Sequence, residues 1–448
     1  MLGVARARTG ARFRSRDALL AWQRKRVRSF LAQALPRVPH YGRPFRDLAE
    51  LPVSTEEQQA ENFAALNTLG IARDAALAAS TVPEPPGGGQ AQGPASPGGV
   101  PENVFAGACA GIGAVTRPYL LSTREHRAEV ARLTARVLTA ECARRVLRPG
   151  GTPLRVGIVA TGPARLLSAL PSSRIQVLEV DPAASVEDQV GQLNDWDPHV
   201  LVAPPAALVR LADARADGLL RVAPVEIVAL GDVLEGADEE RVRAAFPVEL
   251  RRILASAEGL LAFTCHRGTL HLDEEHARFE KHWLDPDRKH FLPVVTVFTR
   301  RTQVTVRLRL DVVLRVAAQE CGCRYRGQAL EAMHGGLDAV LTAHRIPADA
   351  SAGAEASGAQ DVVRVFPEEV ARALAEVGGD GAFEDWRIRQ QPGVLVVRLR
   401  EPRRGIERRV ERALWALFAD VGANAPAIRF EDWVDDGDDA SLQRIRVA

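Results

Sequence analysis

Lysine is scarce in this chain, and charges of neither sign predominate. Of the 448 residues, 58 are Lys or Arg, but only Lys25, Lys281 and Lys289 are lysines, and 57 Asp and Glu leave a formal net charge of +1. A chain without a surplus of one sign lacks the long-range field that attracts nucleic acid or an anionic membrane. We therefore expect partners that are recognised through local contacts, with no nucleic acid and no membrane among them.

Long apolar runs and a cysteine framework are also missing. No apolar run reaches about 18 residues, the length that a membrane span requires. The arginine-rich start has no apolar segment behind it that would complete a signal peptide. Asp17, which opens an amphipathic helical pattern over 17–35, favours a first helix over a transit peptide. The five cysteines, an odd number, exclude a disulfide scaffold and favour a reducing compartment, so we expect a cytoplasmic protein.

The order of hydrophobic patterns predicts an α/β fold. Hydrophobic residues make up 46% of the chain, enough for two or three packed cores. Between about 153 and 265, short β-rich runs alternate with helical runs, which is typical of βαβ units and a mostly parallel sheet. From 270 to 314 the sequence becomes strand-rich.

Composition also divides the chain into domains. Residues 343–361 are mostly small and polar, which favours a hinge, and the helix and strand patterns beyond it predict a small α+β domain. We therefore predict a large N-terminal domain over 1–342, a hinge over 343–361 and a C-terminal domain over 362–448. Proline and glycine dominate 81–101, which indicates a flexible loop within the first domain; an inter-domain linker has the same composition and remains the alternative.

Cysteine and histidine form the strongest candidate site. The motif CHRGTLH begins at Cys265 and ends at His271, and a CGC motif carries Cys321 and Cys323. Zinc binds three thiolates and one imidazole in tetrahedral geometry, and four protein ligands would make a closed, structural site. His266 could replace His271 as the fourth ligand. The alternative is that these cysteines are simply small buried residues.

A glycine cluster and one carboxylate are weaker candidates. Gly107, Gly111 and Gly113 could let backbone N–H groups approach phosphates, but the run lacks the end of a P-loop and the dinucleotide-binding spacing. A tight turn is the alternative. Glu258, in ASAEG, follows a predicted strand of the β/α region, where strand ends face ligand crevices.

Several segments, taken in their order along the chain, resemble the adenylate-forming enzymes, specifically the phenylacetate-CoA ligase-like family and its branch of coenzyme F synthetase-related proteins. The resemblance covers nearly the whole chain. It is carried by ENFAALNTLGI at 61–71, PHVLVAPPAALVRLA at 198–212, ASAEGLLAFTCHRGTLHLDEE at 255–275, and CGC with HGGLDAVL further on. The resemblance implies a large N-terminal α/β domain and a small mobile C-terminal domain. It also implies a reaction in which ATP and a carboxylic acid give an acyl-adenylate that passes to CoA or an amine, and some members bind zinc through such a Cys/His set.

The chain departs from the family's pattern at several separate positions that contact ATP, although Glu258 itself is kept. The hydroxyl-rich phosphate loop aligns with 109–114, which has no hydroxyl. Leu254 and Ala257 stand where the family has an aromatic residue and a threonine before its metal-binding glutamate, here Glu258. Val312 stands in place of the aspartate that binds the ribose, Gly336 in place of the hinge arginine, and Ser441 in place of the C-terminal lysine. All three lysines precede residue 290, and the planar guanidinium of arginine replaces a compact ammonium poorly.

These departures favour a divergent family member in which adenylation is weak or absent. Such a protein could bind an acyl or aryl carboxylic acid or support a partner enzyme in a biosynthetic pathway. The alternative is a working ligase that uses magnesium-ATP through Glu258, with a nucleotide site built from Gly107, Gly111, Gly113, Asp232 and Arg307 or Arg309. A third hypothesis is a zinc-stabilised scaffold without a small-molecule site.

Overall fold

The computed structural model describes most of the chain. The described residues are 13–80, 99–110, 116–148, 150–159, 174–231, 234, 236–345, 362–379, 381–434 and 442–447. Nearly all of the loop predicted over 81–101 and of the hinge predicted over 343–361 lies outside these ranges, as do Gly111, Gly113, Asp232 and Ser441. Within the described ranges, no helix is long and apolar enough to cross a membrane.

The chain divides into two compact units. The first comprises Met1–His282, Phe291–Leu310 and Leu314–Met333. The second comprises Trp283–His290, Asp311–Val313 and His334–Ala448. The domain boundaries that we derived from the sequence stay predictions.

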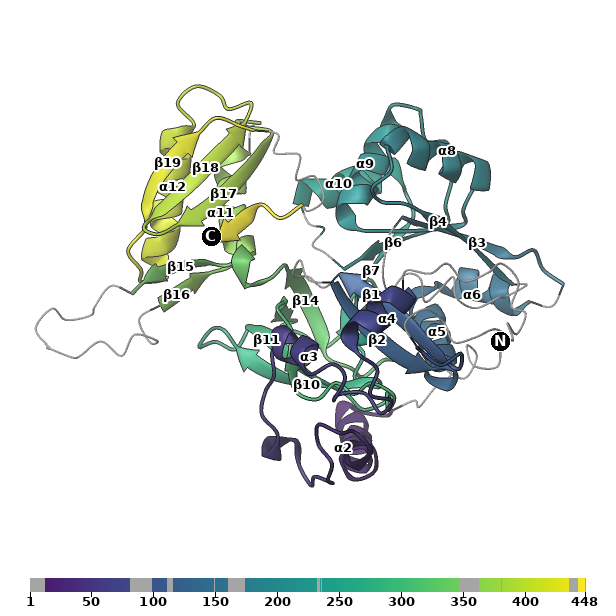
Figure 1. Cartoon of the computed structure of the whole chain (residues 1–448). Helices are drawn as coiled ribbons and strands as arrows, with labels where there is room; N and C mark the ends of the chain where they lie inside the picture. The colour runs from purple at the N-terminus through teal and green to yellow at the C-terminus, as the bar shows by residue number, and fades with distance from the viewer. Residues whose placement is uncertain are drawn as a thin grey trace, which may run out of the picture. The chain divides into compact units, whose positions relative to one another are not determined.

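A 12-stranded mixed sheet is the largest element of the fold (Figure 1). Its strands follow the order β10-β11-β13-β14-β9-β8-β7-β6-β5-β3-β4, and β12 pairs with β11. The strands are β3 (Leu154–Val159), β4 (Ile175–Val180), β5 (Val200–Ala203), β6 (Glu226–Leu230), β7 (Glu249–Ser256), β8 (Gly259–Thr264), β9 (Leu270–Leu272), β10 (Ala277–Trp283), β11 (His290–Val297), β12 (Leu308–Arg309), β13 (Val313–Val316) and β14 (Ala329–His334).

The half of this sheet from β4 to β7 is parallel. Its strands alternate with α8 (Val186–Trp196), α9 (Pro205–Ala216) and α10 (Gly236–Ala245). All four residues of β5 are buried, as expected for a parallel strand that is covered on both faces. Beyond β7 the pairing becomes antiparallel, from β7 to β8 and from β8 to β9. This arrangement confirms the predicted α/β fold class.

Capping residues in the sequence explain where several helices begin and end. Ser185 caps α8 by accepting a hydrogen bond from the Asp188 amide at 3.1 Å, and Asp197 ends that helix with a φ of 49°. Ser122 and Glu125 form a capping box at the start of α5 (Thr123–Val137). The helix α6 (Ala140–Leu147) follows, and residues of both helices pack in one hydrophobic core with residues of β3, β5, β7 and β8.

The N-terminal part of the first unit adds a helix and a hairpin. The helix predicted over 17–35 is α2 (Arg16–Gln33), whose Phe30 and Leu31 share a core with Phe298 and Val306. The hairpin pairs β1 (Val104–Ala110) with β2 (Thr116–Ser122). The remaining helices before it are α3 (Glu56–Glu61), α4 (Arg73–Ser80) and the 3₁₀ turns η1 (Leu35–Arg37) and η2 (Leu48–Glu50).

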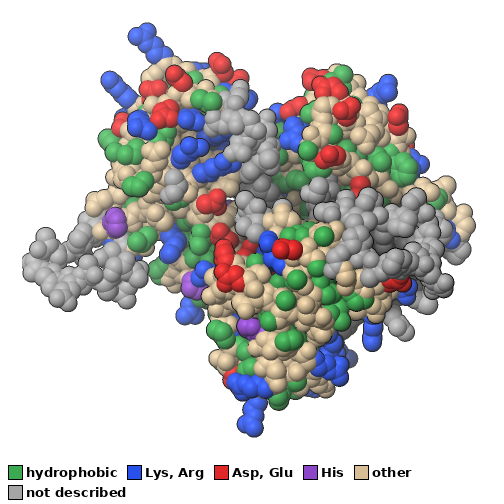
Figure 2. All heavy atoms as spheres, in the orientation of Figure 1, with side chains coloured by type: hydrophobic (Ala, Val, Ile, Leu, Met, Phe, Trp, Pro, Cys, Tyr) green, Lys and Arg blue, Asp and Glu red, His purple; other side chains and the backbone are tan. Residues whose placement is uncertain are grey.

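The second unit packs two helices on one face of a four-stranded sheet (Figure 1). The sheet has the order β19-β18-β17-β20, and a two-stranded sheet pairs β15 with β16. The elements are η3 (Leu337–Ala339), β15 (Leu341–His344), β16 (Val362–Val365), α11 (Pro367–Gly378), β17 (Asp385–Gln391), β18 (Val394–Arg400), α12 (Glu407–Asp420), β19 (Ala427–Glu431) and β20 (Ile445–Val447). Figure 2 shows Lys/Arg and Asp/Glu side chains lying among one another on the visible face, in line with the small net charge.

Candidate functional site

Glu258 lies in the tight connection between β7 and β8. It is followed by Gly259, whose φ of +102° is a conformation that side chains disfavour. A Cβ at Gly259 would also overlap the carboxylate of Glu129. The turn therefore requires glycine, and it directs Glu258 into the protein, where its residue is only 3% exposed.

A buried arginine forms an ion pair with the carboxylate of Glu258. Arg117, from β2, donates one hydrogen bond to each carboxylate oxygen, both at 2.8 Å. The Ser256 hydroxyl donates a third at 2.6 Å. Burial alone would raise the pKa of Glu258, but Arg117, Ser256 and the nearby Arg300 outweigh it and lower the pKa. Glu258 is therefore an ionised carboxylate whose charge is already neutralised inside the fold.

The space around this pair is small. Arg117, Glu258, Tyr119 and Arg300 line a cavity of about 20 Å³. That volume holds about one water molecule, whereas pockets for small ligands measure roughly 300–1,000 Å³. Within the described residues of the first unit, the cavity against Glu258 is therefore much smaller than a typical small-ligand pocket.

A second buried ionic network, which the sequence did not single out, lies next to Glu258. Arg132 pairs with Glu129 at 2.7 Å, and Arg300 lies 3.6 Å from the same carboxylate. His276 Nδ1 contacts both Arg132 and Thr299, and its Nε2–H donates to the Glu258 carbonyl at 2.9 Å. The only signal in the sequence was that His276 directly follows the segment 255–275 of the family resemblance.

Burial and charge fix the protonation of this network. Burial alone would raise the pKa of Glu129, but Arg132 and Arg300 lower it to about 2. Burial, reinforced by Arg132, lowers the pKa of His276 to about 3. At neutral pH, Glu129 is charged and His276 is neutral, which agrees with the hydrogen bonds that the imidazole makes.

Of the other predicted nucleotide-site residues, Gly107 and Arg307 lie within the described ranges, and each has contacts of its own. Gly107 faces Tyr119 across the β1–β2 hairpin, and a Cβ there would overlap the phenol ring, so packing already explains this glycine. Arg307 pairs with both oxygens of Glu280 at 3.0 Å and donates to the Leu51 carbonyl. Neither of these residues contacts Glu258 through a hydrogen bond given above. Gly111, Gly113 and Asp232 lie outside the described residues, and the nucleotide site as a whole stays a prediction.

The Cys/His set predicted from the sequence is brought together in space. The ligand atoms of Cys265, His271, Cys321 and Cys323 all lie within 4.8 Å of one another. The sulfurs of Cys265 and Cys321 are 3.8 Å apart, and Cys323 Sγ lies 3.5 Å from His271 Nε2. His266 is exposed and is not a member of this group.

These separations fit a tetrahedral zinc ion. With Zn–S bonds of about 2.3 Å and Zn–N bonds of about 2.0–2.1 Å, two sulfurs lie about 3.8 Å apart and a sulfur and a nitrogen about 3.5 Å. His271 Nδ1 lies 2.9 Å from the Gly327 carbonyl, and a hydrogen bond there leaves Nε2 to face the sulfurs. Such a hydrogen bond orients the ligating imidazole.

A larger cavity adjoins the cysteine cluster. It measures about 530 Å³ and has both apolar and polar lining, with Arg252 and Thr264 among the polar residues. Its apolar side chains come from Leu234, Leu270, Leu330 and Met333, and Cys321 also contributes. The volume lies within the range of small-molecule pockets.

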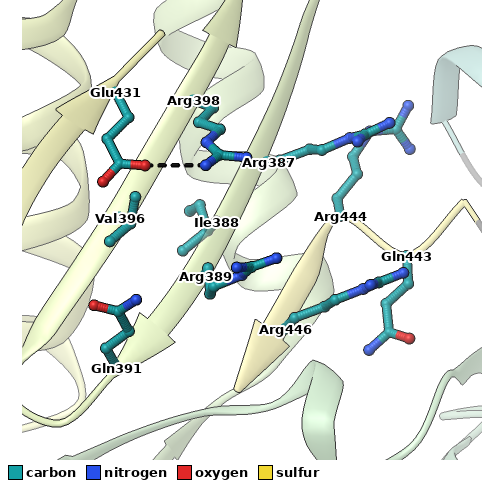
Figure 3. A pocket seen from close by; sticks show the side chains of 10 residues that line it. All are labelled: Arg387, Ile388, Arg389, Gln391, Val396, Arg398, Glu431, Gln443, Arg444 and Arg446. Carbon is teal, nitrogen blue, oxygen red and sulfur yellow. Dashed lines mark hydrogen bonds and ion pairs between the residues drawn. The ribbon is translucent and has the colours of Figure 1, made fainter. Parts of the chain in front are cut away.

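Arginines crowd the face of the second unit's sheet that lies opposite the helices (Figure 3). Arg387 stands opposite Arg398, and Arg389 stands opposite Arg446, in the registers of the paired strands. Glu431 pairs with Arg398 at 3.0 Å. Like charges placed directly opposite destabilise a sheet unless anions offset them, so this small cavity of about 60 Å³ is suited to an anionic group.

The chain has the fold of adenylate-forming CoA ligases. It superposes on 2-hydroxyisobutyryl-CoA ligase in the postadenylation state in complex with R3-HIB-AMP, with a TM-score of 0.58 and 14% identity over 99% of this chain and 91% of that one. An open conformation of the same ligase in complex with 2-HIB-AMP and CoA gives a TM-score of 0.55 and 14% identity, over 96% and 91%. No family model and no curated protein matches the sequence.

Proposed function

We propose that this protein is a divergent adenylate-forming-type protein that binds an acyl or aryl carboxylic acid but forms an acyl-adenylate weakly or not at all. The observation that carries the proposal is the pair of 2.8 Å hydrogen bonds between Arg117 and Glu258. A carboxylate that binds magnesium must offer its oxygens to the ion. Here both oxygens accept hydrogen bonds from a guanidinium, and a cavity of about 20 Å³ adjoins them.

A titration with magnesium-ATP tests this proposal. Calorimetry on the full chain should give no micromolar binding, and no carboxylic acid should provoke release of pyrophosphate. Micromolar binding of magnesium-ATP, or pyrophosphate release that depends on a carboxylic acid, would overturn the proposal. An Arg117→Met variant is informative beside the wild type, because it releases Glu258; nucleotide binding in the variant alone would identify Arg117 as the group that blocks the site.

The cavity of about 530 Å³ supports retained binding of an organic acid. Its apolar lining suits an acyl chain or an aromatic ring, and Arg252, which also pairs with Glu239 at 3.2 Å, is a cation for a carboxylate. The similar structures are of 2-hydroxyisobutyryl-CoA ligase in complex with 2-HIB-AMP and CoA or with R3-HIB-AMP, so 2-hydroxyisobutyric acid and related acids are the first ligands to test. Met333→Trp should fill the cavity and abolish binding, whereas Met333→Leu should leave it intact.

The Cys/His cluster is proposed to hold one structural zinc ion. The support is the agreement of two separations with tetrahedral zinc: 3.8 Å between the sulfurs of Cys265 and Cys321, and 3.5 Å between Cys323 Sγ and His271 Nε2. Zinc here would join the β8–β9 region to the CGC segment and contribute to folding, with no position open for catalysis. Elemental analysis of the wild type should find about one equivalent of zinc at this site. Cys321→Ser or Cys323→Ser should remove that equivalent.

A working ligase is the second candidate, and the arginine face of the second unit favours it. Five arginines line that cavity, a setting suited to the phosphates of a nucleotide or of CoA. Under this alternative, binding of CoA should weaken in Arg389→Gln and Arg446→Gln. Binding of CoA without pyrophosphate release would support the divergent protein and count against the ligase.

A further inference from the structure

A second group of metal-ligating side chains lies in the second unit, separate from the cysteine cluster. The ligand atoms of His290, His334 and Glu368 all lie within 4.8 Å of one another. His290 begins β11, His334 ends β14, and Glu368 lies in the first turn of α11. Side chains from three chain segments thus converge on one point, and no local sequence motif predicts this convergence.

The carboxylate of Glu368 stands between the two imidazoles. One of its oxygens lies 2.7 Å from His290 Nε2, and the other lies 3.2 Å from His334 Nε2. Two nitrogen or oxygen ligands of one tetrahedral zinc ion, bound at about 2.0–2.2 Å, lie about 3.4 Å apart. A small rotation of the carboxylate therefore suffices to admit an ion between the three groups.

Neighbouring groups hold His290 in the orientation that a metal ligand needs. Asp285 Oδ2 lies 2.5 Å from His290 Nδ1, and it also accepts a hydrogen bond from the His290 amide at 2.8 Å. The ring stacks on Phe366 with centroids 3.6 Å apart. A carboxylate on the far nitrogen of a ligating histidine fixes its tautomer and raises its basicity, and here that partner leaves Nε2 to face Glu368.

The position of Glu368 favours its ionised form. It lies in the first turn of α11, where the helix dipole stabilises negative charge. His290 and His334 are 5% and 1% exposed, whereas Glu368 is only partly buried. Two imidazoles and one carboxylate in a largely buried setting, with one side reaching solvent, make a three-ligand site with a coordination position left for water.

We propose that His290, His334 and Glu368 bind a divalent transition-metal ion, with Zn²⁺ as the probe, and that Asp285 orients His290 for this role. Imidazole and carboxylate ligands suit zinc and its neighbours in the first transition row. This site is distinct from the Cys/His cluster in ligands and in position along the chain. The alternative is a metal-free hydrogen-bonded network in which a protonated His290 lies between two carboxylates.

Metal stoichiometry of the full chain distinguishes these alternatives. The protein is stripped with a chelator, loaded with Zn²⁺ and freed of excess ion, and its metal content is measured. Glu368→Gln and His290→Gln should each lose one equivalent relative to wild type. Glu376→Gln, on the exposed face of the same helix, and His344→Gln, an exposed histidine of the same unit, are matched controls that should lose none.

Cobalt substitution supplies a second, spectroscopic readout, measured on variant protein whose fold circular dichroism has first verified. In a Cys321→Ser/Cys323→Ser background, Co²⁺ should bind with visible d–d absorption but without the thiolate-to-cobalt charge-transfer band that the cysteine cluster produces in wild type. Failure of this background to bind Co²⁺, or equal metal content in Glu368→Gln and Glu376→Gln, would overturn the proposal and leave the metal-free network. Because this site does not contain ATP-site residues, the outcome is independent of the proposed function.

Discussion

The exchange of Glu258 for glutamine tests whether this residue is a structural ion-pair partner or a magnesium ligand. Arg117 and Glu258 have side chains that are 8% and 4% exposed, and two hydrogen bonds of 2.8 Å join them. Glu258→Gln keeps the shape and removes the charge. The guanidinium of Arg117 then stays buried, with Glu56 at 3.4 Å as its remaining anionic contact.

The size of the effect follows from that burial. Removal of one partner of a buried ion pair costs about 3–5 kcal/mol because the other charge is left without compensation. The partial compensation by Glu56 favours the lower end of that range. A magnesium ligand predicts the opposite sign, since an ionised carboxylate that awaits a metal is unfavourable in the free protein and its neutralisation stabilises the fold.

Thermal and urea unfolding of wild type and Glu258→Gln measure this difference. We expect the variant to lose about 3 kcal/mol, with a melting temperature lower by roughly 3–6 °C. Glu61→Gln, on the exposed end of α3, is the control and should change stability by less than about 0.5 kcal/mol. The double variant Arg117→Met/Glu258→Gln should recover most of the loss, because replacing both members of a buried pair is often neutral. A Glu258→Gln protein as stable as wild type would refute the reasoning.

Three further predictions concern packing, protonation and metal. Gly107→Ala should destabilise the protein by about 1–3 kcal/mol in urea unfolding, because the added Cβ overlaps the Tyr119 ring. Gly191→Ala, in the open middle of α8, is the control and should stabilise the protein by up to about 1 kcal/mol. Equal effects of the two substitutions would contradict the packing account. His276 has a pKa of about 3 in the folded protein, below its value of about 6.5 when unfolded, so its contribution to stability is complete above pH 6.5 and falls as the pH drops. From pH 7 to 5 this amounts to about 2 kcal/mol, and His276→Gln should flatten that slope in urea titrations. A chelator that removes zinc, or Cys323→Ser, should lower the unfolding free energy by about 3 kcal/mol or more; a fully stable metal-free protein would rule the zinc proposal out.

Periodic and compositional signals are what the sequence could supply about the fold. Alternating strand and helix patterns between 153 and 265 predicted the parallel half of the large sheet, because a fully buried strand and an amphipathic helix each need a characteristic spacing of apolar residues. The helix that begins at Arg16 was predicted to within two residues at each end from the same kind of spacing. The need for glycine at Gly259, by contrast, became visible only in the structure, where its φ is +102°.

Residue type was enough to find the cysteine cluster but not to choose its fourth member. Cys265, Cys321 and Cys323 are chemically rare, so their number and pairing drew attention to them. His266 and His271 remained equivalent on spacing alone, and the antiparallel pairing of β8 with β9 decided between them, because it points His271 inward and leaves His266 exposed.

What only the tertiary structure decided was the partner of each charge. Glu258 looked like a surviving ligand because a sequence does not show that Arg117, 141 positions away, donates to both of its oxygens. The same holds for His290, His334 and Glu368, which three separate segments bring within 4.8 Å. Secondary structure is determined by near neighbours along the chain, whereas the protonation, metal affinity and availability of a side chain depend on groups that only the folded chain places beside it.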